Sequence, residues 1–127
     1  MARGDPADQA ILRLESRRFA TRCEMQVALI QRADSLRELS RLATIPLPYR
    51  LTEDFPCRDA QRHVAQAAED RAREIIHEQI DRCLRAEPER REILKSKLAE
   101  EWGNLTGVLG HLRAWAQGKL ASAQQMR

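Results

Sequence analysis

The stretch LATIPLPYRLTEDFPC, residues 42–57, separates two long segments that favour helix. It contains three of the five prolines in the chain, Pro46, Pro48 and Pro56. A residue that precedes a proline avoids the helical region of backbone conformation, so helix cannot continue through this stretch. We therefore predict an extended crossover over residues 44–56.

The apolar residues of the crossover indicate that it packs on the rest of the chain. Ile45, Leu47, Leu51 and Phe55 are separated by polar or turn-forming residues, as in an extended segment laid across an apolar surface. The alternative is a segment that docks a protein partner through Leu47, Tyr49 and Phe55. The prolines lack the PxxP spacing of a polyproline ligand, so that mode of binding is not favoured.

The segment before the crossover predicts a first helix over about residues 6–43. Asp5 followed by Pro6 is typical of a helix start, and an apolar stripe follows at steps of three and four residues. The stripe changes phase after Ile30, and Ser35 and Glu38 have the spacing of a capping box. A break near Asp34 is therefore the alternative to one continuous helix.

Two further helices are predicted, over about residues 57–86 and 88–121. Pro88 suits the first turn of a new helix, so the two should form an αα-hairpin; one long helix kinked at Pro88 is the alternative. The last helix has an apolar stripe made of Leu94, Leu98, Trp102, Leu105, Leu109, Leu112, Ala116 and Leu120. Because this stripe stays in phase across Gly103 and Asn104, we expect one helix rather than two.

The glycines of the last helix predict which of its faces packs inward. Gly103, Gly107 and Gly110 lie opposite the leucines, and we expect them to meet the alanine-rich first half of the preceding helix. The leucine face would then be turned toward the first helix and, where that helix does not cover it, toward a partner, through Trp102, Leu105, Leu109, Leu112 and Trp115. The alternative is that the glycines mark a solvent-facing break at Gly103 and that the leucines pack on the preceding helix.

Composition favours one all-α domain over residues 1–127, an elongated, coiled-coil-like antiparallel bundle of three helices. Leu, Ile, Val and Phe make up about a fifth of the 127 residues, while alanine supplies 18. Such a chain builds a thin core between long helices more readily than a globule with a deep pocket.

Charge favours exposed, ion-paired helix faces. The net charge is +3, with 22 basic and 19 acidic residues, and an acidic segment at 51–87 lies between two basic ones. The arginines alternate with Asp or Glu at helical spacing rather than forming one basic face. Nucleic acid is therefore an alternative partner but not the favoured one.

No residues in the sequence are assigned to a catalytic, metal or cofactor site. Glu74 and His77 resemble half of a di-iron helix motif, but the second half and the additional glutamates are missing. Cys23, Cys57 and Cys83 have no CxxC spacing, and no apolar run has membrane length. We expect a reducing, soluble compartment, cytoplasmic or nuclear, with the mitochondrial matrix as an alternative.

These features predict a non-enzymatic subunit or adaptor that joins a protein assembly through helix–helix packing, as a homo- or hetero-oligomer. A nucleic-acid-associated accessory protein that uses arginine-rich faces is one alternative. A helical secretion or assembly chaperone is another, because its sequence would show the same long amphipathic helices.

Overall fold

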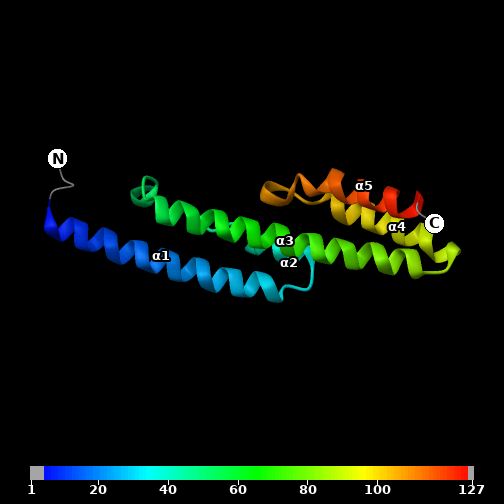
Figure 1. Cartoon of the computed structure of the whole chain (residues 1–127), viewed down its shortest axis with the longest axis horizontal. Helices are drawn as coiled ribbons and strands as arrows, with labels where there is room; N and C mark the ends of the chain where they lie inside the picture. Colours follow the sequence, from blue (N-terminus) through cyan, green and yellow to red (C-terminus); the bar gives the residue numbers. More distant parts are fainter. Residues whose placement is uncertain (1–4, 126–127) are drawn as a thin grey trace.

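The computed structural model describes residues 5–125, and within that range the fold is entirely helical and elongated (Figure 1). The predicted all-α class is confirmed, but the helices in this range number five rather than three. They are α1 (Pro6–Arg32), α2 (Leu36–Leu42), α3 (Phe55–Arg85), α4 (Pro88–Gly103) and α5 (Leu112–Gln125), with short 3-10 turns η2 (Tyr49–Leu51) and η3 (Gly107–Leu109).

Helix α3 runs through the middle of the molecule, with α1 on one side and the α4–α5 pair on the other (Figure 1). The hydrogen bond from Ser16 to Asp54 and that from Arg71 to the carbonyl of Ala33 both join residues 38 apart in sequence. A constant separation means that α1 and α3 run parallel. The predicted antiparallel bundle is wrong here, because the chain returns along α1 to the level of Ser16 before α3 begins.

The return segment consists of α2 and the crossover, which are packed as the sequence predicted. Ile45 and Leu51 are buried, and Leu47 is half-buried. The side-chain amides of Gln26 and Gln61 donate to the carbonyls of Leu42 and Ile45, each over 3.0 Å. These bonds satisfy backbone groups that an extended segment cannot satisfy by itself.

The first predicted helix is broken at residues 33–35, so the alternative break near Asp34 is correct. Ser35 is the N-cap of α2, and its hydroxyl accepts from the backbone N–H of Glu38 over 3.1 Å. The break has a packing cause. Ala33, Leu36 and Leu39 are all fully buried, and the change in stripe phase after Ile30 requires the chain to turn in order to bury them.

Helix α4 folds back along α3 after a tight turn at residues 86–87. Pro88 occupies the first turn of α4, as predicted, and Arg91 donates to the carbonyls of Leu84 and Ala86, both over 3.1 Å. These bonds cover carbonyls that the end of α3 leaves without a helical partner.

The predicted single helix over 88–121 is wrong, since α4 ends at Gly103 and α5 runs back along it (Figure 1). The leucines stay buried because the reversal at residues 104–111 turns them toward the same core. A Cβ atom at Gly103 or Gly107 would meet no atom within 4 Å, so the predicted contact between small faces is also wrong. The alternative of a solvent-facing break is correct.

The break at Gly107 generates a stability prediction. Gly107 has a φ of +60°, a conformation that costs residues with a side chain about 1 kcal/mol or more. Gly107→Ala should therefore lower the free energy of unfolding by about 1 kcal/mol, measured by urea denaturation. Gly103→Ala is the matched control and should be neutral or slightly stabilising. Equal effects at both positions would contradict the strained turn.

Candidate functional site

The side of α1 that faces away from α3 carries a second apolar stripe. Helix α1 packs on the body of the protein through Phe19, Cys23 and Ile30, all of which are buried. Four large side chains on the other side are about half exposed: Ile11 (50%), Leu14 (49%), Met25 (63%) and Leu29 (52%). At 3.6 residues per turn they fall within about 60° of arc. We call this set the outer stripe.

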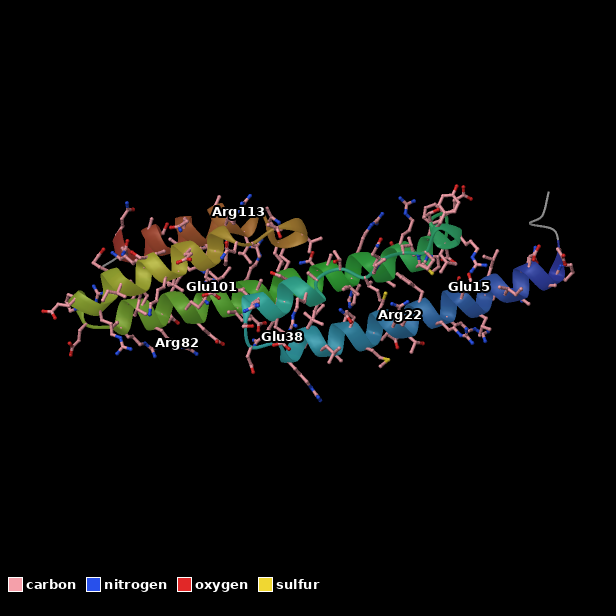
Figure 2. The ribbon with its side chains drawn as sticks, turned by 180° about the vertical axis from the view of Figure 1, so that it is seen from behind. Glu15, Arg22, Glu38, Arg82, Glu101 and Arg113 are labelled. Carbon is pink, nitrogen blue, oxygen red and sulfur yellow. The ribbon has the colours of Figure 1, made fainter. Side chains whose placement is uncertain are left out.

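Two arginines interrupt the outer stripe at its middle. Arg18 falls within this arc and Arg22 about 20° beyond its edge, and along the helix both lie between the pair Ile11 and Leu14 and the pair formed by Met25 and Leu29. Both arginines are exposed, and neither takes part in an ion pair within residues 5–125. Figure 2 shows α1 along one edge of the molecule, with side chains extending from its outer side into solvent.

The crossover meets the N-terminal end of the outer stripe. A groove of about 330 Å³ lies between Ile11 and Leu12 of α1 and the segment that includes Tyr49 and Thr52. An ion pair from Arg50 to Glu15 joins the two elements. Tyr49 lines this groove and is 90% exposed. This predicted docking residue therefore lies beside the N-terminal end of the outer stripe.

The other predicted crossover residues have different surroundings. Phe55, at the first turn of α3, is 72% exposed and was wrongly expected to pack with the crossover. Leu47 is only half-buried and packs against the core cluster.

The predicted partner surface on the last helix is wrong, because most of its residues are buried. Trp102, Leu105, Leu109 and Leu112 are at most 2% exposed and fill the core of the chain itself. The indole N–H of Trp102 donates to Oε1 of Gln79 over 2.9 Å, which ties α4 to α3. These side chains were assigned to a surface because the reversal after Gly103 is not visible in their spacing.

Trp115 is the exception, since it is half-buried at the contact between α5 and α3. The guanidinium of Arg73 lies 4.5 Å from its ring centre, and the ring of His77 approaches it edge-on at 5.3 Å. Glu69 accepts from Arg73 over 2.6 Å and from His111 over 3.1 Å, and these two bonds lower the pKa of Glu69. The cluster fastens α5 to α3, with His77 packed on Trp115.

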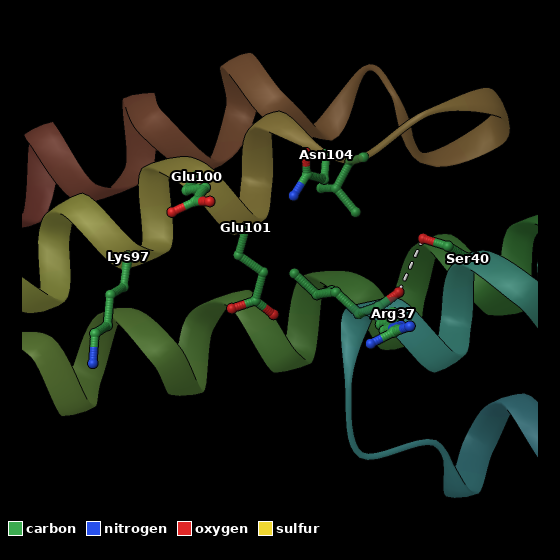
Figure 3. A pocket seen from close by; sticks show the side chains of 8 residues that line it. Arg37, Ser40, Lys97, Glu100, Glu101 and Asn104 are labelled. Carbon is green, nitrogen blue, oxygen red and sulfur yellow. Dashed lines mark hydrogen bonds between the residues drawn. The ribbon is translucent and has the colours of Figure 1, made fainter.

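A second concave region lies between α2 and the end of α4. This cleft, of about 590 Å³, is lined by side chains of both charges: Arg37 from α2, and Lys97, Glu100 and Glu101 from α4 (Figure 3). The hydroxyl of Ser40 donates to the carbonyl of Leu36 over 3.0 Å, so it is already engaged in its own helix. Opposite charges around an open cleft favour weak polar contacts more than the binding of one charged ligand.

Cys23 and Cys57 are buried in the contact between α1 and α3. Burial raises the pKa of the Cys23 thiol and that of the Cys57 thiol, which favours the protonated, less nucleophilic form. Beside them, Asp54 caps α3: its carboxylate accepts from the Ser16 hydroxyl over 2.7 Å and from the backbone N–H of Cys57 over 3.0 Å. This cap therefore also holds the start of α3 against α1.

The capping carboxylate predicts a pH dependence. The hydrogen bond from Ser16 is the main cause that lowers the pKa of Asp54, so this group stabilises the fold above its unfolded pKa near 4 and loses that contribution as the pH falls. Asp54→Asn keeps a capping oxygen but does not titrate. Its free energy of unfolding should therefore fall less than that of the wild type between about pH 4 and pH 2.

Urea denaturation across this pH range measures the effect. Asp59→Asn, an exposed change in the same helix, is the control and should retain the acid sensitivity of the wild type. If Asp54→Asn lost as much stability as the wild type, another group would be responsible.

Burial predicts opposite behaviour for two aromatic residues that the sequence assigned to partner-binding surfaces. Trp102→Ala removes a buried ring and its hydrogen bond, and should cost about 3–5 kcal/mol in the free energy of unfolding. Phe55→Ala removes an exposed ring and should stay within about 0.5 kcal/mol of the wild type. Thermal and urea denaturation distinguish the two, and a mild effect of Trp102→Ala would contradict the assigned core.

Among residues 5–125, no group of three or more His, Cys, Asp or Glu side chains is arranged to hold a metal ion. Within the same range, each helix is too short or too polar to cross a lipid bilayer. In comparisons with protein-family models, with curated proteins and with solved structures, the chain matches none of them.

Proposed function

We propose that the chain is a helical interaction subunit that binds another protein through the outer stripe of α1. The observation that best supports this proposal is the location of the large exposed apolar side chains. Seven are exposed among the described residues, and six of them lie on α1 or within residues 49–55. Scattered exposed apolar residues need no explanation, but a cluster on one helix is typical of a protein-binding surface.

The spacing of the outer stripe favours a helix as the bound element. Its apolar and arginine positions follow one another at three or four residues, which is the pattern that helix–helix packing requires. The first turns of α1 extend beyond the rest of the molecule, so a partner can approach them without meeting α3 (Figure 1). Tyr49, beside Ile11, would extend the contact at that end.

The contribution of the outer stripe to the free energy of binding can be estimated from the burial of its apolar side chains. Completing the burial of a half-exposed Leu, Ile or Met contributes about 1 kcal/mol, and the four together about 4 kcal/mol. The loss of translational and rotational freedom on association costs at least as much. The apolar part alone therefore supports only weak binding, and a stable complex needs further contacts.

The size of the native complex tests this proposal. In extract of the cells that produce it, the chain should elute in size-exclusion chromatography at a mass well above its own 14.6 kDa. Replacing Ile11, Leu14, Met25 and Leu29 by serine should return it to the monomer position, because these changes remove the apolar contact and leave the buried face of α1 unaltered. Serine at the exposed Ile93 of α4 is the matched control and should leave the elution unchanged. Elution of the wild type as a monomer would contradict the proposal.

A further inference from the structure

The two arginines of the outer stripe restrict what can cover it. A helix that contacts both Leu14 and Met25 must pass beside Arg18 and Arg22, which lie between them along the axis of α1. Burying these guanidinium groups without partners is strongly unfavourable, whereas pairing them with carboxylates restores hydrogen bonds and charge balance. The partner therefore has to supply acidic groups at the middle of the contact.

Within residues 5–125, no acidic side chain forms an ion pair with Arg18 or Arg22. Arg17 and Arg32 flank the stripe, while the acidic residues of α1 lie elsewhere. Glu24 falls on the far side of the helix from Arg22, and Glu15 is bound to Arg50. The remaining acidic groups near the stripe, Asp8 and Glu53, lie at the groove beside Tyr49 rather than at its centre.

A second copy of this chain does not fit the surface. The stripe is symmetric about its middle, so an antiparallel pair that places Ile11 on Leu29 also places Arg18 against Arg22 of the other copy. A parallel pair in register places each arginine against its own equivalent. Like charges that face one another at the centre of a small contact oppose association in both arrangements.

We infer that the partner of α1 is an amphipathic helix of another protein that carries Glu or Asp beside its apolar stripe. This inference rests on the proposed function and adds the chemistry of the partner. The outer stripe spans 19 residues from Ile11 to Leu29, about 27 Å at a rise of 1.5 Å per residue, so the partner helix needs at least about five turns. Its acidic residues should lie near the middle of those turns, between apolar residues at each end.

Two synthetic helical peptides test the charge requirement. Both have 28 residues and the same leucine heptads; one carries Glu at the flanking positions and the other carries Lys, so each repels its own copies. In fluorescence anisotropy titrations with the full chain, the Glu peptide should bind at least tenfold more tightly than the Lys peptide. Its affinity should also fall as salt is raised from about 50 to 500 mM.

The second experiment reverses the charge of the two arginines on the protein. The double variant Arg18→Glu with Arg22→Glu should reverse the preference, so that the Lys peptide binds more tightly. The matched control, Arg82→Glu with Arg90→Glu, changes two exposed arginines on other helices and should keep the preference of the wild type. Circular dichroism checks that both variants retain their helix content.

Each of the remaining outcomes of these experiments would contradict a specific part of the proposal. Equal binding of the two peptides, or tighter binding of the Lys peptide by the wild type, would overturn the acidic partner and leave the helix-binding function standing. Binding of neither peptide would overturn both. Concentration-dependent dimerisation of the isolated chain through the outer stripe would assign it to a second copy. Binding of a 20-base-pair DNA duplex that is lost in the Arg18→Glu and Arg22→Glu variant, without peptide binding, would assign it to nucleic acid.

Discussion

The parallel packing of α1 on α3 is the constraint on which the rest of the structure depends. Two helices that follow one another in sequence can lie parallel only if the chain between them returns along their length. Here α2 and the crossover make that return, and they stay packed because Gln26 and Gln61 satisfy carbonyls that have no helical partner. Asp54 and Arg71 then hold the two helices together near the two ends of the contact.

This arrangement determines which surfaces remain available. Helix α3 is covered on one side by α1 and on another by the α4–α5 pair, so its long apolar face is fully used within the chain (Figure 1). Helix α1 packs on α3 along one side, and in the described range the four apolar side chains of the outer stripe stay about half exposed. The exposed apolar side chains of α1 are therefore a consequence of its place at the edge of the molecule.

Electrostatics has a different role in the body of the protein and on α1. Most ion pairs of the described residues lie within one helix, as for Arg71 with Glu74 and Lys95 with Glu92, and such exposed pairs contribute only tenths of a kcal/mol. Charge pairing in the body of the protein is therefore mostly local. Arg18 and Arg22 form no ion pair within residues 5–125, which leaves their charge available to a partner.

The sequence by itself determined the helical segments, the cap at Asp5, the extended crossover and the turn before Pro88, because each depends on residues close together in the chain. It left the breaks at Asp34 and Gly103 as alternatives, since a stripe can stay in phase across a reversal. Tyr49 was identified as exposed, whereas Trp102, Leu105, Leu109 and Leu112 were placed on the wrong side of the fold and the outer stripe was missed. Only the tertiary structure decided the parallel direction of α1 and which of its two apolar faces is buried. Helical periodicity reports that a face is apolar, but whether that face is covered depends on the path of the chain between helices.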